Sequence, residues 1–379
     1  MTASETSHVY LHPHAQTFAP HTRPEVLDFH RRLPGYAPTP LVSAPHLAAA
    51  LGVGEVWVKD ESHRLELPAY KILGASWATY RELETLFGPF EPWTTLDGLA
   101  AQLRPHLPLV LVAATDGNHG RAVARVAGWL GLQAHILVPQ DMVEARQRAI
   151  VGEGARLQII HGSYDEAVMA AAERADGRHV VISDTAWDGY TRVPGWVVEG
   201  YSTIFLEIDA QLAARHAPPP DVVAVQMGVG SLAAAVVRHY RAADMPTRVV
   251  GVEPLHADCV LRSLQAGQPV ETPGPHPSIM AGLNCGTVSP LAWPLLRDGL
   301  NASVAIPDAR AEDAMRMLAA DGVVSGESGA AGAGGLIALL TGPDARRHRD
   351  ALDLTPHSRV LIVSTEGATD PQAYARILG

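Results

Sequence analysis

The most constraining feature of the sequence is an alternation of short apolar segments with longer amphipathic ones between residues 109 and 182. This pattern predicts strands at 109–113, 134–138, 156–160 and 180–182, with helices at 120–130, 143–153 and 164–175. A strand–helix repeat of this length folds into a parallel sheet, because each helix carries the chain back to the same end of the sheet. The chain is therefore predicted to have an α/β fold.

The rest of the chain continues the pattern with longer interruptions. Further strands are predicted at 55–59, 221–226, 248–252, 302–307 and 359–364, and further helices at 43–51, 195–208, 232–243 and 308–319. Residues 1–40 are rich in Pro and His and are predicted to form a rigid, extended or turning arm. Residues 88–108 are a polar insertion with a short helix near 95–104.

Composition excludes several classes of protein. The 379 residues are 47% hydrophobic, which is enough to bury a sizeable core, so a disordered chain is excluded. The net charge of −11 and the lack of a basic block argue against a nucleic-acid partner. No apolar stretch is long enough for a membrane span and the start lacks a signal-peptide core, so we expect a cytoplasmic protein with no membrane partner.

Cysteine usage excludes a disulfide framework, since the chain has only Cys259 and Cys285. The two are interpreted either as small buried hydrophobic residues or as one disulfide. No His or Cys cluster has the spacing of a zinc site, so no metal is expected.

Lysine is scarce in this chain. Lys and Arg together number 29, yet Lys59 and Lys71 are the only lysines. Arg replaces Lys at a solvated surface but not where a nucleophilic amine is needed, because the guanidinium stays protonated. Lys59 ends a strand before Asp60 and Glu61, where an ion pair is expected. Lys71 is placed in the first turn of a helix, whose dipole should make the amine easier to deprotonate and suited to Schiff-base chemistry.

Two glycine-bearing turns follow predicted strands. Gly228-Val229-Gly230-Ser231 leads into a helix, so it is either a phosphate-binding loop or a plain tight turn. It is neither a Rossmann fingerprint nor a P-loop. The turn from Thr115 to Gly120 could hold a carboxylate, and its Asp116 is either an acid at the mouth of the sheet or a helix N-cap. One special lysine with a phosphate loop and a carboxylate loop indicates pyridoxal 5'-phosphate (PLP).

The chain resembles the tryptophan-synthase-β-like, fold type II family of PLP enzymes from about Phe29 to its C-terminus. The resemblance is carried by seven motifs, at residues 33–41, 58–62, 69–76, 115–120, 183–190, 325–329 and 364–370. It implies two open, mostly parallel twisted sheets flanked by helices, with the cofactor in the interdomain cleft. The larger domain would comprise 1–84 and 190–379, and an inserted smaller domain 85–189. A homodimer is also implied.

The resemblance implies a role for each matching residue. Lys71 matches the Schiff-base lysine, Asn118 the asparagine that bonds the ring oxygen of the cofactor, and Ser364 the hydroxyl that meets the pyridine nitrogen. The loop of Gly228, Val229, Gly230 and Ser231 matches the phosphate cup. Glu327 is expected either to line the pyridine side or to cap a Gly-rich helix.

Departures from the broad family carry the expectation about substrate. Asp116 stands where many members have a small or hydroxylic residue, and a carboxylate binds ammonium better than hydroxyl. The implied reaction is α,β-elimination on a small amino acid, 2,3-diaminopropionate in both D and L forms, to give pyruvate and two ammonia. Asp184 would bind the second ammonium of the substrate or else cap a strand end. The expected substrate-binding residues are Thr115, Asp116, Gly117, His119, Asp184 and Thr185.

Two rival functions remain open from the sequence. The first is a serine/threonine dehydratase-like β-eliminase of the same fold, against which Asp116 argues. The second is a protein that binds PLP or a nucleotide without turnover, which the presence of Lys71, Asn118 and Asp116 disfavours.

Overall fold

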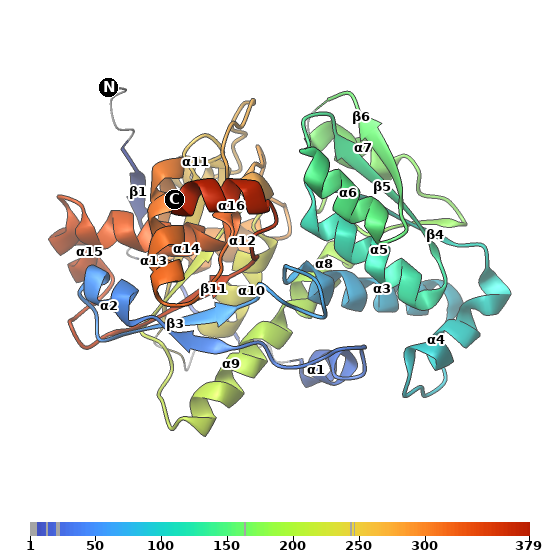
Figure 1. The fold of residues 1–379 in the computed structure, drawn as a ribbon, viewed down its shortest axis with the longest axis horizontal. Coiled ribbons are helices and arrows are strands. Elements are labelled where there is room, and N and C mark those ends of the chain that lie inside the picture. The colour runs from blue at the N-terminus through green and yellow to red at the C-terminus, as the bar shows by residue number, and fades with distance from the viewer. Residues whose placement is uncertain (1–5, 13, 20–22, 163, 243–244, 246) are drawn as a thin grey trace. The chain divides into compact units, whose positions relative to one another are not determined.

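The structure is a computed structural model that describes residues 6–12, 14–19, 23–162, 164–242, 245 and 247–379. The chain divides into two compact units (Figure 1). The first unit comprises Met1–Thr22, Pro38–His63 and Ile204–Gly379, and the second comprises Arg23–Ala37 and Arg64–Thr203.

The first unit is built on a seven-stranded sheet with the order β1-β10-β9-β8-β11-β3-β2. The five inner strands are parallel, and the two edge strands, β1 and β2, are antiparallel to their neighbours. The strands are β1 (His8–Leu11), β2 (Leu41–Ser43), β3 (Glu55–Asp60), β8 (Val222–Gln226), β9 (Arg248–Pro254), β10 (Ala302–Ile306) and β11 (Arg359–Ser364). The helices are α2 (Pro45–Leu51), α9 (Ser202–Ala214), α10 (Ser231–Tyr240), α11 (Cys259–Ala266), η2 (Ala281–Leu283), α12 (Trp293–Gly299), α13 (Asp308–Ala320), α14 (Glu327–Thr341), α15 (Ala345–Ala351) and α16 (Pro371–Leu378).

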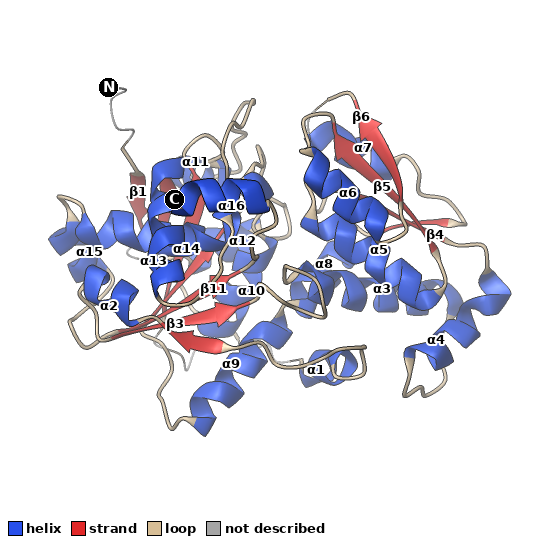
Figure 2. Cartoon of the chain, viewed as in Figure 1, coloured by secondary structure: helices blue, strands red, loops and turns tan. Residues whose placement is uncertain are grey.

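Both faces of this sheet are covered. Alternate residues of β8, Val222 and Ala224, belong to one core cluster with Leu336 of α14. The alternate residues Val223 and Val225 are equally buried and lie on the other face, where α10 packs on β8 and β9 (Figure 2). A parallel strand that is buried on both faces has consecutive apolar residues, and this strand could therefore be predicted from the sequence.

The second unit holds a four-stranded, all-parallel sheet with the order β6-β5-β4-β7. Its strands are β4 (Val110–Ala114), β5 (Gln133–Pro139), β6 (Arg156–Ile160) and β7 (His179–Val181). Its helices are α1 (Pro24–His30), α3 (Lys71–Phe87), α4 (Leu96–Leu103), η1 (Arg104–His106), α5 (Asn118–Leu130), α6 (Glu144–Gly152), α7 (Tyr164–Ala172) and α8 (Arg192–Gly200).

The two sheets share a topology that determines where their functional loops lie. In the second unit the chain runs from β4 outward to β5 and β6, and then returns to place β7 on the other side of β4. In the first unit it runs from β8 to β9 and β10, and returns to place β11 on the other side of β8. Ligands of open α/β sheets bind at the carboxyl ends of the strands at such switch points. The loops after β4 and β7, and those after β8 and β11, are therefore candidate ligand loops.

The boundaries of the units differ from the expected inserted domain at 85–189. The second unit also contains α1, α3 and α8. The reason is packing, because α3 lies against both α5 and α8 and so belongs to the unit of those helices.

Two local predictions differ from the structure. The single helix expected at 195–208 is two helices, α8 and α9, which are separated at Tyr201. The arm predicted for residues 1–40 contains β1, which pairs with β10, and α1, which starts at Pro24 and buries Val26, Phe29 and His30. Edge pairing and burial against distant residues formed these elements, so local pattern did not reveal them.

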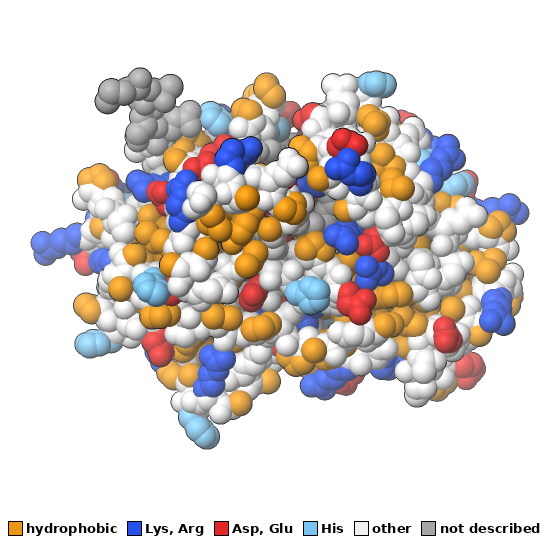
Figure 3. All heavy atoms as spheres, in the orientation of Figure 1, with side chains coloured by type: hydrophobic (Ala, Val, Ile, Leu, Met, Phe, Trp, Pro, Cys, Tyr) orange, Lys and Arg blue, Asp and Glu red, His pale blue; other side chains and the backbone are white. Residues whose placement is uncertain are grey.

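No helix of the described residues has both the length and the apolar character of a membrane span. Basic and acidic side chains are interspersed on the face drawn in Figure 3. Cys259 and Cys285 are both buried, and no disulfide joins them in the described part of the chain.

Candidate active site

Lys71 is the first residue of α3, and its side chain is 19% exposed. Its Nζ donates a hydrogen bond to Oδ2 of Asp184 over 2.6 Å. Burial lowers the pKa of the Lys71 ammonium, but Asp184 together with Tyr201, Tyr70 and Asp116 outweighs burial, and the net pKa lies well above the ordinary value. The prediction of a more easily deprotonated amine was therefore wrong for this state, because a carboxylate 113 residues away in the sequence holds the proton on Lys71.

Asp184 lies in the loop that follows β7, at the carboxyl end of the sheet. The Tyr164 hydroxyl donates a hydrogen bond to its Oδ1 over 3.3 Å. Burial raises the pKa of the Asp184 carboxyl, but the charge and hydrogen bond of Lys71, together with His119 and the Tyr164 hydroxyl, lower it more, and the net pKa lies well below the ordinary value. Asp184 is thus a buried carboxylate that binds the Lys71 ammonium, and its binding of a substrate ammonium stays a prediction.

The loop after β4 places Asp116 at the same end of the sheet. The Thr115 hydroxyl accepts hydrogen bonds from the Gly117 and Gly120 amides over 2.9 and 3.0 Å, and this fixes the turn. The N-cap of α5 is Gly117, at φ +149°, so Asp116 is not the helix cap. Asp116 is half-buried, and its charge is among those that raise the pKa of Lys71. Asn118 is the first residue of α5.

His119 is buried behind these acids. Its Nε2 donates to the carbonyl oxygen of Ile182 over 2.8 Å, because that oxygen can only accept. Its Nδ1 lies 4.0 Å from Oδ2 of Asp184 and has no hydrogen bond to any described residue. Burial lowers the pKa of His119, so the ring is neutral and directs a lone pair toward Asp184. Thr185 is half-buried, and its amide donates to the Ser183 hydroxyl over 3.2 Å.

In the first unit the glycine loop joins β8 to the ten-residue helix α10. Gly230 has φ +98°, and a Cβ there would lie 2.6 Å from Cδ1 of Leu296. A Cβ on Gly228 would lie 3.1 Å from Sγ of Cys285. The loop is held from outside, since the Ser289 amide donates to the Val229 carbonyl over 2.9 Å. Backbone amides at the start of a helix in such a loop are suited to a phosphate group.

Ser364 is the last residue of β11, beside β8, and is fully buried. Its hydroxyl lies 2.8 Å from that of Ser325. Glu327 is the first residue of α14 and is buried. The Ser328 amide in this first turn donates to the Glu366 carboxylate over 3.2 Å. Sequence reasoning passed over Ser325 and Glu366, although both belong to motifs that carried the resemblance.

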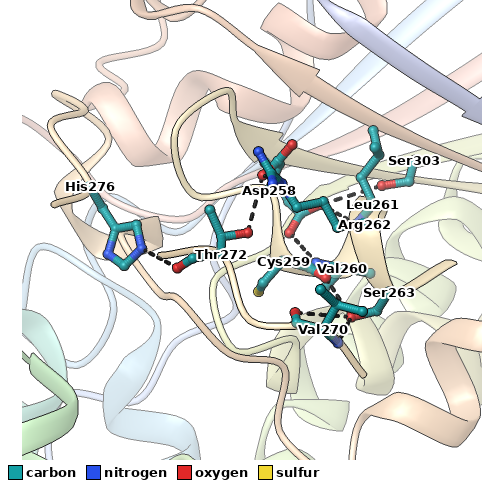
Figure 4. A network of polar contacts seen from close by, with 11 residues as sticks. Asp258, Cys259, Val260, Leu261, Arg262, Ser263, Val270, Thr272, His276 and Ser303 are labelled. Carbon is teal, nitrogen blue, oxygen red and sulfur yellow. Dashed lines mark hydrogen bonds and ion pairs between the residues drawn. The ribbon is translucent and has the colours of Figure 1, made fainter. Parts of the chain in front are cut away.

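A polar network lies next to these loops in the first unit. Figure 4 shows Asp258 accepting a hydrogen bond from Thr272, and His276 donating one to the carbonyl oxygen of Thr272, over 3.1 and 2.9 Å. The Thr272 amide in turn donates to the Gly286 carbonyl over 2.9 Å. The network thus ties the start of α11 to the segment that contains Cys285, against which Gly228 packs.

Glu253, at the end of β9, belongs to the same region and is fully buried. Its carboxyl oxygens accept hydrogen bonds from the Val260 and Leu261 amides, both over 2.8 Å, at the start of α11. Burial raises the pKa of Glu253 to about 8 despite these bonds. The native protein therefore holds a proton on this group at neutral pH.

A Glu253→Gln variant should remove a pH dependence of stability. An unfolded Glu titrates near ~4.3, so between that pH and about 8 the native state binds the extra proton. The free energy of unfolding of the parent protein should fall as pH rises through this window, by an amount on the order of a few kcal/mol. The variant lacks the titration and should gain stability relative to the parent from pH 5.5 to 8.5, measured by urea unfolding.

The matched control for this prediction is Glu271→Gln, which alters an exposed glutamate in the same region. Its unfolding curves should follow those of the parent at every pH. If the free energy of unfolding of Glu253→Gln changed with pH in the same way as that of the parent from pH 5.5 to 8.5, Glu253 would not carry the proton.

Lys59 has a structural partner set in the first unit. Its buried Nζ lies 2.7 Å from Oε2 of Glu207, 2.7 Å from the Thr39 carbonyl oxygen and 3.1 Å from Oε1 of Gln211. An ion pair was the right expectation, and the structure shows one with Glu207 of α9, which the sequence did not identify. Pairing across 148 residues could not be inferred from the neighbouring sequence.

The residues present fit PLP. Gly228 and Gly230 let the loop after β8 pack closely where a Cβ would meet Cys285 or Leu296, and α10 offers its first amides to a phosphate. In the second unit Lys71 carries a primary amine, the group that bonds an aldehyde, and in the first unit Ser364 carries a buried hydroxyl, which suits a ring nitrogen.

Comparison with known proteins supports this assignment. The model of the family described as pyridoxal-phosphate dependent enzyme matches residues 32–366. Diaminopropionate ammonia-lyase of Salmonella typhimurium is 37% identical over 370 residues, which cover 93% of this chain and 91% of the relative. The enzyme of the same name from Escherichia coli K12 is 35% identical over 367 residues, covering 93% and 89%.

Solved structures agree with these relatives. The crystal structure of diaminopropionate ammonia lyase from Escherichia coli in complex with D-serine has a TM-score of 0.90 and 32% identity, and covers 99% of this chain and 97% of that one. The same enzyme in complex with an aminoacrylate-PLP azomethine reaction intermediate gives a TM-score of 0.87 at 32% identity, covering 99% and 97%. Maize serine racemase, at 21% identity and a TM-score of 0.74, shares the fold. The chain therefore belongs to the family of pyridoxal-phosphate dependent enzymes.

Proposed function

We propose that this enzyme catalyses the α,β-elimination of 2,3-diaminopropionate, in both D and L forms. One substrate and one water give one pyruvate and two ammonia. The observation that carries the proposal is the pair of acids at the switch point of the second unit. Asp184 already binds an ammonium group there, and the charge of Asp116 acts on the same lysine. A substrate with two amino groups is suited to such a pair.

The cofactor-binding roles follow the geometry of each unit. Lys71 would form the covalent link to PLP, and Asn118 would bond its ring oxygen. Gly228, Val229, Gly230 and Ser231 would hold the phosphate, Ser364 the ring nitrogen, and Glu327 would line that side. When bound, PLP supplies an electron sink that acidifies the Cα proton of the attached amino acid.

Proton movement would be shared by Lys71 and the two acids. For Lys71 to act as a base, its Nζ must first give up the proton that the Asp184 carboxylate now stabilises. The neutral amine would then take the Cα proton of the L isomer, and Asp116 would take that of the D isomer from the opposite face. Asp184 would bind the Cβ amino group of the substrate in its protonated, ammonium form. This group would then leave Cβ as neutral ammonia.

Thr115, Gly117, His119 and Thr185 would complete the substrate site. Thr115 fixes the turn that presents Asp116. The neutral His119 ring has its Nδ1 4.0 Å from Asp184, where it would accept a hydrogen bond from a bound ammonium. We also propose a cytoplasmic homodimer, which the family resemblance supports and which light scattering of the purified protein would test.

The deciding experiment measures pyruvate release from D- and L-2,3-diaminopropionate and from D- and L-serine under identical conditions. Fast release from both diaminopropionate isomers is the expected result. Fast release from serine alone would make the enzyme a serine/threonine dehydratase-like β-eliminase and would leave Asp116 with a structural role. No release from any of them, with PLP bound, would favour a binding protein without turnover.

A further inference from the structure

Helices α3 and α8 of the second unit approach each other unusually closely. A Cβ on Gly200 would lie 2.6 Å from the carbonyl oxygen of Leu73 and 2.8 Å from Cα of Gly74. A Cβ on Gly74 would lie 2.6 Å from Cε1 of Tyr201. The two glycines therefore let the Tyr201 ring lie directly against the first turn of α3. Gly74 is three residues after Lys71, so it shares a face of the helix with Lys71.

The hydroxyl of Tyr201 is buried in this position. The side chain is fully buried, and the oxygen makes no hydrogen bond of ordinary geometry to the described residues. The ring packs on that of Tyr70, with 4.7 Å between centroids, and Tyr70 directly precedes Lys71. The Tyr70 hydroxyl is nevertheless close enough to act on the Tyr201 hydroxyl as a hydrogen-bonding group, and it acts on Lys71 in the same way, so the Tyr201 hydroxyl lies among the polar groups around Lys71.

The charged and polar groups around this hydroxyl are those of the candidate active site. Burial raises the pKa of Tyr201 well above its ordinary value, and the groups that act on it include Lys71 and Asp184. Tyr201 is therefore a neutral phenol at every physiological pH. Its oxygen can accept an N–H from a neutral amine, which leaves the lone pair of that amine free.

We propose that Tyr201 is a positioning residue for Lys71, whose hydroxyl takes over the lysine amine when the amine is neutral and has left Asp184. The inference rests on the proposed function only in that Lys71 forms the link to PLP. In that step the neutral amine adds to the aldehyde carbon, a C–N bond forms and one water leaves. A held amine with a free lone pair reacts faster than one that rotates freely.

The test compares Tyr201→Phe with Tyr240→Phe in the full chain. Tyr240, in the first unit, is also fully buried with a hydroxyl that makes no hydrogen bond to the described residues, so both variants remove the same kind of group. Protein stripped of cofactor is mixed with PLP, and the visible absorption of the Lys71-linked cofactor is followed by stopped flow. The rate should fall about tenfold in Tyr201→Phe at an unchanged end point. Tyr240→Phe should match the parent.

Steady-state kinetics give a second readout. The kcat of Tyr201→Phe should fall about tenfold for both isomers of diaminopropionate, with KM changed less than about twofold, because Lys71 serves both isomers. Gly74→Ala should show the same loss by displacing the ring while keeping the hydroxyl. Its control is Gly128→Ala in α5, where a Cβ meets nothing within 4 Å.

The outcomes separate this inference from the proposed function. If Tyr201→Phe links PLP as fast as the parent and as Tyr240→Phe, the inference is overturned whatever the substrate. If the parent links PLP normally and Tyr201→Phe links it slowly, the inference holds, even if diaminopropionate proves not to be the substrate.

Discussion

Replacing Lys71 by Arg is expected to abolish turnover of both isomers of diaminopropionate, with a loss in kcat of ~10⁴-fold or more. Arg keeps the positive charge that Asp184 binds, so the fold around the site should persist. The guanidinium, however, stays protonated and provides no neutral amine to link the cofactor or take the Cα proton. The measurement is pyruvate release, together with the visible absorption of protein mixed with PLP, which should be absent.

Lys59→Arg is the matched control, because these are the two lysines of the chain. Lys59 is fully buried against Glu207 in the first unit, so its replacement should lower the melting temperature. The variant should still link PLP and keep its activity within about tenfold. If Lys71→Arg kept the visible absorption and Lys59→Arg lost it, Lys59 rather than Lys71 would be the lysine that links PLP.

Asp116→Asn is expected to separate the two isomers. Turnover of the D isomer should fall by about 10² to 10⁴-fold, the range for loss of a general base. Turnover of the L isomer should stay within about threefold, because Lys71 takes its proton. Asn keeps the size of the side chain, and Asp116 is not the N-cap of α5, so the turn should be retained.

The control for this variant is Asp188→Asn, which changes an exposed acid of the same unit and should leave both isomers unaffected. Equal losses on the D and L forms in Asp116→Asn would assign Asp116 to binding the substrate ammonium. Unchanged D turnover would leave it with neither role.

The positions of most strands along the chain, and of the loops that follow them, could be predicted because they depend on local pattern. Buried parallel strands such as β8 are continuous apolar runs, and the loops after β4 and β8 carry glycines and polar groups at strand ends. The sequence therefore placed Asp116, Asn118 and the Gly228–Ser231 loop at strand ends without any three-dimensional information, and their roles stay predictions. The sequence indicated where each residue lies in the fold, but not which side chain it contacts.

Long-range pairing explains what could not be predicted. The proton on Lys71 is fixed by Asp184, and Lys59 is fixed by Glu207, each more than a hundred residues away. The break between α8 and α9 at Tyr201 likewise depends on the close packing of Gly200 on α3. A helix pattern within 195–208 contains no information about that contact.

The shared topology of the two sheets has an evolutionary consequence. The phosphate loop after β8 and the acids after β4 and β7 belong to separately packed units with separate cores. Under the proposed function, a substitution at Asp116 would change which leaving group is accepted without altering the loop after β8 that would hold the cofactor phosphate. A lineage built on this plan can therefore exchange one amino-acid substrate for another through a few changes in one loop while its hold on the cofactor stays constant.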